Sequence, residues 1–340
     1  MRLIRLSVAL ATLLTFALAA PKPRQNGGCI NKTARKPWQM LKPQEKSDYI
    51  KAELCLMSSP PKLNIPGAQN RWDELQWNHV IQTNFVHDVG AFLPWHRYYV
   101  TVHANLLRDE CGYHGPIPYW DETGDADAFG DTDAFSNAAI FKPDAFGGNG
   151  VGNGTKNCIA NGPFVDTTLH LPKLHQEPVD YCIYRKFNST SIQRAKQINI
   201  DKCFAIQDYT SAWECWHKDP HNGGHSAIGG LMMDVVLSPG DPLFFLHHCW
   251  VDAMWHKWQL MDLENRLTDM GGRNILTPEY MKRFDFTYPG PEFTDYSGDP
   301  GNVTTLNHVL YMADLAPNVT IGDVMDVGGE TICAEYFYNE

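Results

Sequence analysis

The chain has 340 residues, of which 43% are hydrophobic and 20% charged, enough apolar material to bury the core of one large domain or two small ones. Its formal net charge of −11 argues against nucleic acid as a partner and indicates solubility in an acidic or extracellular medium. After residue 20 no stretch is long and apolar enough to span a bilayer, so we expect no membrane association.

The beginning of the chain has the pattern of a secretory signal peptide. Two arginines precede an apolar run over residues 6–18, and small residues follow it. A buried core helix or a transmembrane anchor is the alternative, but the apolar run is short for either. We therefore divide the chain into a signal peptide, residues 1–20, and a single secreted, extracellular domain, residues 21–340.

Sugar acceptors and cysteines agree with secretion. The nine cysteines are an odd number, which in an oxidising compartment predicts disulfides and one free thiol. We expect Cys249 to be the free one, because it lies in an apolar helical run. Spacing suggests the pairs Cys203 with Cys215, Cys158 with Cys182 and Cys29 with Cys333. The N-x-S/T acceptors are Asn31, Asn153, Asn188, Asn302 and Asn318.

Helical patterns surround the first histidines. Residues 43–56 fit one face of a helix approximately, and a second helix should follow over residues 72–86, with His79 on its inner side. A third should cover residues 95–110, with His96 pointing inward from its first turn. These patterns place two histidines on neighbouring helices.

Residues 121–162 are dominated by Gly, Asp, Asn and Ala, which predicts a long loop layer over the helices. An acidic stretch within this layer matches part of an EF-hand calcium loop. However, Phe129 occupies a ligand position and Ser136 stands where a bidentate glutamate is needed. We interpret the stretch as a solvated loop.

An Asp-Pro pair at residues 219–220 predicts a helix start, because aspartate caps helices and proline suits their first turn. His221 and His225 then stand at i and i+4 on one face. The two glycines between them each cost roughly 1 kcal/mol of helix propensity relative to alanine. Close approach of a second helix or of a substrate must therefore favour their small size.

A second Asp-Pro pair opens residues 241–260, which predict an apolar and therefore central helix. His248 shares a face with Phe244 and Asp252. Adjacent helical residues cannot point the same way, so we expect His248 to bind metal and His247 to support the ligands by hydrogen bonding.

Six histidines in two sets of three predict two metal ions. Imidazoles without carboxylate or thiolate suit copper better than magnesium, calcium or manganese, and zinc sites usually stop at three or four ligands per ion. We therefore expect two copper ions per chain. The two sets are His79, His87 and His96, and His221, His225 and His248. The histidines without such context, which we expect to be structural, are His103, His114, His170, His175, His217, His256 and His308.

Several motifs resemble those of the type-three copper proteins, namely tyrosinases, catechol oxidases and haemocyanins. The chain looks most like short secreted fungal polyphenol oxidases, over nearly all of its length after the signal peptide. The resemblance rests on the two histidine helices, E-K-x-x-Y-I-x-A-x-x-C-L from Glu45, F-L-P-W-H-R-Y-Y around His96, P-Y-W-D from Pro118 and Y-F-Y from Tyr336.

The resemblance implies a mainly α fold, in which a central four-helix bundle holds a dinuclear copper site among long loops and few short strands. The first histidine set would hold copper A and the second copper B. The implied activity is oxidation of o-diphenols to o-quinones by dioxygen, with hydroxylation of monophenols as a further hypothesis. The partners would be dioxygen and a small phenolic substrate, and the protein a monomer or small homo-oligomer.

The resemblance also implies roles for three other residues. Phe244 would form part of an apolar wall above copper A, and an ordinary core aromatic is the competing interpretation. Relatives that hydroxylate monophenols have an asparagine directly after the first copper B histidine and a glutamate that holds a water. Asn222 matches the asparagine, and Glu214 is the nearest acidic candidate, for which helical surface charge is an equally good explanation.

The chain departs from the family pattern in three places. Phe85 stands where many fungal members have a cysteine that crosslinks to the second copper A histidine, and Glu122 replaces the last tryptophan of P-Y-W-D-W. The short stretch after His248 leaves no room for a C-terminal shielding domain. Two alternatives to a broad polyphenol oxidase remain: an oxidase that tailors one secondary metabolite, and a haemocyanin-like oxygen carrier.

Overall fold

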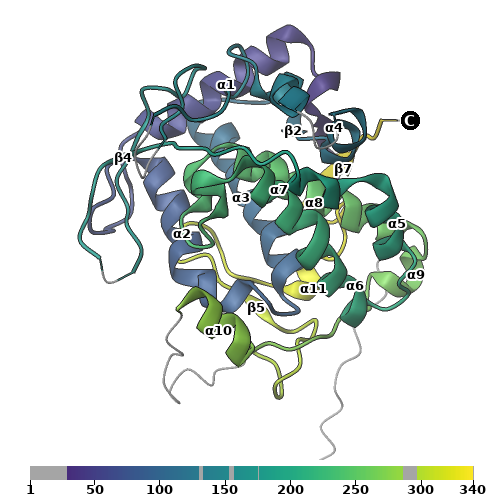
Figure 1. Cartoon of the computed structure of the whole chain (residues 1–340). Coiled ribbons are helices and arrows are strands. Elements are labelled where there is room, and N and C mark those ends of the chain that lie inside the picture. Colours follow the sequence, from purple (N-terminus) through teal and green to yellow (C-terminus); the bar gives the residue numbers. More distant parts are fainter. Residues whose placement is uncertain (1–28, 130–132, 153–156, 175, 286–296, 340) are drawn as a thin grey trace, which may run out of the picture.

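The fold is mainly helical, as predicted (Figure 1). The computed structural model describes residues 29–129, 133–152, 157–174, 176–285 and 297–339, so the predicted signal peptide and the acceptor Asn153 lie outside the described residues. The helices are α1 (Pro43–Ser58), α2 (Arg71–Val86), α3 (Phe92–Cys111), α4 (Glu122–Phe129), α5 (Gln197–Phe204), α6 (Tyr209–Trp216), α7 (Asn222–Ile228), α8 (Leu243–Leu260), α9 (Leu263–Arg266), α10 (Pro278–Phe284) and α11 (Ile321–Val324).

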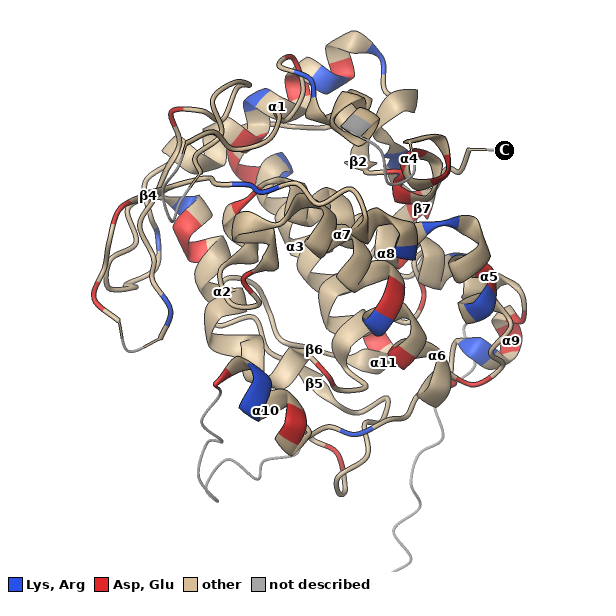
Figure 2. Cartoon of the chain, in the orientation of Figure 1, with Lys and Arg blue, Asp and Glu red and all other residues tan. Residues whose placement is uncertain are grey.

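Helices α2, α3, α7 and α8 lie side by side at the centre, with α3 packed against α2 and α8, and α7 against α8 (Figure 1). α2 begins at the Asn70 cap, whose side chain accepts from the Asp73 amide at 2.8 Å. α8 begins beside Asp241, which accepts from the Leu243 amide at 3.0 Å. Both helices follow their predicted ranges closely. Figure 2 shows that charge gathers on outer helices such as α1, α5 and α10, while α7 carries none.

The helix start predicted at residues 219–220 is wrong. α6 continues into α7 through a wide π-helical turn, His217–His221, with Pro220 inside it. Proline lacks an N–H and its ring collides with the carbonyl of the preceding turn, so a π turn lets the helix pass through it. His221 therefore lies at the junction between two helical segments.

The loop layer predicted for residues 121–162 is correct only in part, because α4 occupies Glu122–Phe129. Trp120 anchors this helix by donating to Asp125 at 2.7 Å. Composition alone hid the helix, since its short run of small and acidic residues has almost no apolar periodicity. α4 matters because its first residue, Glu122, is buried and hydrogen-bonds His247 on α8.

The strands are short and few. β1 (Thr33–Pro37) lies between β2 (Ile117–Tyr119) and β7 (Ala334–Tyr336), parallel to both. This sheet brings both ends of the described chain to α8. The remaining strands form two antiparallel pairs, β3 (Thr168–Leu169) with β4 (Tyr181–Cys182) and β5 (Val309–Leu310) with β6 (Val319–Thr320).

Disulfides fasten the loops to this framework. All three pairs suggested by spacing are present, together with Cys55–Cys111, which joins α1 to the end of α3. Cys249 is free and buried, as predicted. Within the described ranges, no helix is both long and apolar enough to cross a bilayer.

Candidate metal centre

The first histidine set meets between α2 and α3. His79, His87 and His96 are buried, and their candidate ligand atoms lie within 4.8 Å of one another. His79 donates from Nδ1 to the Val236 carbonyl, and the other two donate to carbonyls four residues earlier, at 2.7 to 3.0 Å. A carbonyl oxygen only accepts, so each neutral ring carries its proton on Nδ1 and keeps the Nε2 lone pair. Among the described residues, Nε2 of His79 and His96 has no hydrogen-bond partner.

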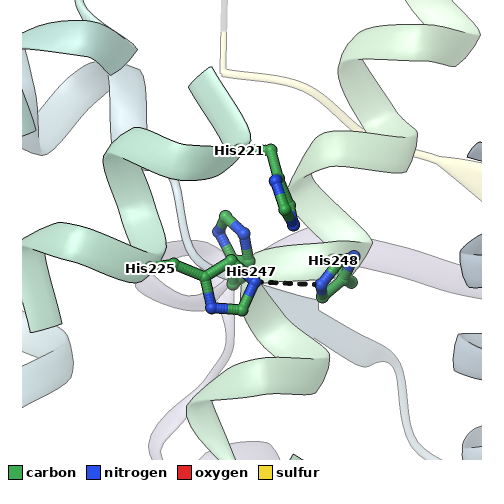
Figure 3. A group of neighbouring side chains, drawn as sticks. All are labelled: His221, His225, His247 and His248. Carbon is green, nitrogen blue, oxygen red and sulfur yellow. Dashed lines mark hydrogen bonds between the residues drawn. The ribbon is translucent and has the colours of Figure 1, made fainter. Parts of the chain in front are cut away.

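The second set meets between the π-helical turn, α7 and α8 (Figure 3). His221 and His225 donate from Nδ1 to the carbonyls of His217 and Met232, at 3.2 and 2.6 Å. Nε2 of His225 then faces Nε2 of His248 at 3.2 Å. Two ring nitrogens at this separation, beside the unpartnered Nε2 of His221, suit a metal ion that accepts lone pairs from all three.

A fourth imidazole, His247, lies beside this set, next to the predicted ligand His248. The candidate ligand atoms of His221, His225, His247 and His248 all lie within 4.8 Å of one another. The ring centroids of His247 and His248 lie 4.9 Å apart, and both rings lie near that of His225, at 4.4 and 5.3 Å (Figure 3). Nδ1 of His247 hydrogen-bonds the side chain of Glu122, so the hydrogen bond of this ring is not to one of the six predicted ligands.

Small residues allow this close packing. A Cβ at Gly224 would overlap both Glu122 and the His247 ring, and one at Gly223 would overlap the Cβ of Arg194. The sequence-based expectation that close approach favours these glycines is therefore confirmed. The neighbours are a buried carboxylate and a short helical turn, Ser191–Ala195.

The two sets share one centre. The rings of His96 and His248 stack at 4.2 Å between centroids with 12° between their planes. Phe244 contacts both sets, at 5.2 Å from His79 and 4.2 Å from His248. It is buried and is not part of the pocket lining, so it packs between the imidazoles within the core.

Burial keeps these imidazoles neutral. Desolvation lowers the pKa of His87 to about 4 and that of His225 to about 3. The pKa values of His79, His96, His221, His247 and His248 are also lowered by burial, and neighbouring imidazoles add to the effect. A neutral imidazole is the form that binds a metal.

We expect the metal-free protein to lose stability as the pH falls from 7 to 5. The folded-state pKa values of these imidazoles lie below the unfolded value of about 6.5, so the unfolded chain binds more protons than the folded chain in this window. Below that value, each imidazole that stays neutral in the folded state lowers the free energy of unfolding by about 1.4 kcal/mol per pH unit. Glu122, whose pKa burial raises, acts in the opposite direction, but it is one group. Denaturant unfolding of metal-free protein at several pH values measures this, and a free energy of unfolding that stays constant from pH 7 to 5 would contradict it.

Neither Glu214 nor Asn222, the two residues considered for monophenol hydroxylation, hydrogen-bonds an imidazole of the centre. Glu214 binds Lys218 at 2.5 Å and Arg273 at 2.8 Å. Asn222 donates to the Lys218 carbonyl at 3.1 Å. Both side chains therefore bond Lys218 in the π-helical turn, and they are not paired with each other.

A pocket of about 400 Å³ opens onto the centre, within the usual range for small ligands. His87, His221, His225 and Asn222 line it, with Met232, Met233, Val235, Tyr280 and Phe284 as the larger apolar and aromatic side chains.

His217, which we expected to be structural, also lines this pocket. Its ring stacks on His221 at 5.2 Å, contacts Phe92 at 4.7 Å and has an Nδ1 without a partner among the described residues. The sequence signal was its spacing, because His217, His221 and His225 follow one another at four-residue intervals.

Comparisons with known proteins agree with this geometry. Residues 69–261 match the family model described as the common central domain of tyrosinase. The chain is 29% identical to N-acetyl-6-hydroxytryptophan oxidase ivoB of Emericella nidulans, over 99% of this chain and 100% of that protein. It is 30% identical to tyrosinase-like protein orsC of the same fungus, over 72% and 79%.

Solved structures show the same fold. A variant of polyphenol oxidase from Thermothelomyces thermophila superposes with a TM-score of 0.72 and 26% identity, covering 91% of this chain and 89% of that one. A functional unit of octopus haemocyanin gives a TM-score of 0.55 and 18% identity, over 89% and 68%, which is a likeness of fold alone.

Proposed function

The chain belongs to the tyrosinase family, and from that premise we propose that it is a dinuclear copper oxidase that uses dioxygen to oxidise o-diphenols to o-quinones. The observation that carries the proposal is the pair of buried imidazole sets joined by the stacked rings of His96 and His248. Such a centre offers neutral nitrogen ligands to two ions within reach of one small molecule.

The donor set fits copper. We propose that His79, His87 and His96 hold one ion and that His221, His225 and His248 hold the other. For the five rings other than His248, support comes from the Nδ1–H donations to backbone carbonyls, which fix the ring orientations and leave Nε2 available. For His248, support comes from its Nε2, which faces that of His225 at 3.2 Å. Glu122, a buried acid beside the second set, is hydrogen-bonded to His247 and not to a proposed ligand.

Copper, when bound, supplies the electron transfer between the phenol and dioxygen. The protein contributes the pocket and the surroundings of the ligands. Met232, Val235 and Phe284 give the phenol ring an apolar surface beside His221 and His225. Phe92 and Phe244 pack against the imidazoles and keep water out of the space around them.

The direct test is quinone formation from catechol by copper-loaded protein in the presence of dioxygen. We expect turnover that stops when dioxygen is removed or copper is chelated. Copper-loaded, folded protein that oxidises none of a panel of catechols would contradict the proposal. Dioxygen binding without turnover of any phenol would favour the haemocyanin-like carrier.

We expect Glu214→Gln to change both catechol oxidation and stability only slightly. The carboxylate is a third exposed and engages Lys218 and Arg273, and such surface ion pairs contribute about 0–1 kcal/mol. Steady-state rates with catechol and with tyrosol, plus a thermal melt, measure the effect. Selective loss of tyrosol hydroxylation with catechol oxidation intact would instead assign Glu214 the water-holding role.

We expect Glu122→Ala to weaken the copper held by the second set by about 10-fold, the lower end of the usual effect of removing a hydrogen-bond partner of a ligand. Glu122 acts one step further away, because the ring that it holds, His247, packs against the ligand rings of His225 and His248 at 4.4 and 4.9 Å between centroids. Glu122 is the partner of His247 Nδ1, and without it the ring loses its fixed orientation beside His248. Copper retention during dialysis against a chelator measures this. Asp121→Asn, a change at the adjacent and less buried carboxylate, is the control and should retain copper. Equal retention by both variants would contradict the prediction.

A tailoring oxidase that acts on one metabolite is the second candidate. It is favoured by the match with N-acetyl-6-hydroxytryptophan oxidase along the whole of both chains, since that relative is named for a single substrate. A panel of catechols and hydroxyindoles separates the two. Similar rates across the panel favour a broad polyphenol oxidase, whereas one dominant substrate favours tailoring.

We further propose that the protein acts outside the cell. Four disulfides support this, because such bonds persist in oxidising compartments. The acceptors Asn31, Asn188, Asn302 and Asn318 are all exposed, as glycosylation would require. Recovery of the protein only from the cytosol of its native host would contradict the proposal.

A further inference from the structure

The mouth of the pocket carries positive charge that the described residues do not neutralise. Three cationic side chains line it, Arg194, Lys218 and Arg283, against one acid, Asp88. This excess of positive charge in the pocket lining contrasts with the formal net charge of the chain, which is −11. The arginines come from separate elements, the Ser191–Ala195 turn and α10, so their positions are set independently.

Lys218 and Asp88 belong to a network of ion pairs whose charges cancel. Asp88 pairs with Arg273 at 2.5 Å, Arg273 also pairs with Glu214 at 2.8 Å, and Glu214 pairs with Lys218 at 2.5 Å. This chain of two acids and two bases is neutral as a whole. Lys218 therefore offers little net charge to a ligand.

Arg194 and Arg283 remain outside that network. In the part of the chain that the structure describes, neither forms an ion pair, and Glu279, one helical turn before Arg283, is not paired with it. Arg283 lies over the Phe284 ring at 5.2 Å, which leaves its guanidinium edge available. Arg194 is held against the site because Gly223 has no Cβ to push its turn away. Both guanidinium groups can donate two parallel hydrogen bonds to a planar anion.

We propose that the substrate of this site is a phenol that carries a carboxylate, and that Arg194 and Arg283 receive this carboxylate at the mouth while the ring lies against the imidazoles. The proposal rests on the phenol oxidase function proposed above and adds the substrate class. The apolar side chains of Met232, Val235 and Phe284 suit the ring and its linker, and the arginines suit the anionic end. The two arginines are specificity residues and take no part in the electron transfer.

The test compares matched ligands that differ only in the carboxylate. For turnover, the pair is hydrocaffeate and its methyl ester. For binding without chemistry, the pair is phenylpropionate and phenylpropionamide, measured by calorimetry on the copper-loaded protein. The variants are Arg194→Gln, Arg283→Gln and the double variant. Lys282→Gln is the control, because Lys282 is exposed on the same helix and is not part of the pocket lining.

We expect the wild-type protein to prefer hydrocaffeate by about 10-fold in kcat/KM, and each single variant to lose about 3-fold of this preference through KM, with kcat nearly unchanged. The double variant should treat acid and ester alike, Lys282→Gln should behave as wild type, and the preference should shrink as salt is added. Phenylpropionate binding should weaken in parallel.

Equal kinetics for acid and ester in the wild-type protein would overturn the proposal. So would tight phenylpropionate binding that both arginine variants retain, since that pattern means that the carboxylate binds copper directly. The measurement of phenylpropionate binding by calorimetry does not depend on turnover. Loss of carboxylate binding in the variants therefore supports the arginines even in a protein that oxidises no catechol, where the proposed function alone would fail.

Discussion

Replacing His248 with alanine is expected to remove one of two copper ions and to lower catechol oxidation by at least about a thousandfold. The ring of His248 lies where the two sets meet, stacked on His96 at 4.2 Å and with its Nε2 facing that of His225 at 3.2 Å. Its loss leaves His221 and His225 as the proposed ligands of the second ion, beside His247, whose Nδ1 is held by Glu122. Removing one member of a group that acts as a unit typically costs nearly the whole activity of that unit.

Copper content per chain and steady-state catechol oxidation measure this effect. The matched control is His256→Ala, on the same helix two turns later, where the ring hydrogen-bonds Tyr338 at 2.7 Å away from the centre. The control should keep both ions. His247→Ala tests the choice between the adjacent histidines: if it loses a whole copper ion while His248→Ala keeps both, the ligand assignment is reversed.

Replacing Asp252 with alanine is expected to destabilise the protein by about 3–5 kcal/mol, the largest stability effect that we predict. Asp252 is buried on α8, one turn after His248, and accepts from Arg35 at 2.9 Å, Arg97 at 2.5 Å and Tyr336 at 2.5 Å. Without it, two buried guanidinium groups lose their counter-charge. The same carboxylate joins α8 to β1, α3 and β7, so its loss also loosens the support of the second histidine set.

Guanidinium denaturation of the metal-free protein measures this loss of free energy, with metal omitted because binding to the folded state would add to the stability. Asp262→Ala is the control, since that carboxylate is exposed and, among the described residues, its hydrogen bonds are to Asn265 in the same turn. We expect the control to change stability by less than about 1 kcal/mol. A loss of under 1 kcal/mol for Asp252→Ala would show that the arginines find other partners.

The sequence predicts those parts of the fold that depend on local patterns. α2 and α8 follow apolar periodicity and capping residues, so their ranges are predicted within a few residues. The spacing of His79 from Trp72 and of His225 from His221 likewise puts those imidazoles on inner faces. The short separation of Cys203 from Cys215 made that disulfide predictable for the same reason.

The sequence does not predict what depends on contacts between distant segments. Glu122 and His247 are hydrogen-bonded across 125 positions, and no periodicity links α4 to α8. The Arg35–Asp252 ion pair spans 217 positions. The π-helical turn was also missed, because Asp219 and Pro220 have the chemistry of a helix start and only the preceding helix α6 makes them part of a continuous one.

The central claim is that two imidazole sets hold two copper ions in one centre. The most direct measurement is the metal content of the purified protein together with its absorption spectrum before and after hydrogen peroxide. Our account predicts about two copper ions per chain and a peroxide-induced band in the near ultraviolet. Zinc in place of copper, or no metal retained by folded protein, would contradict it.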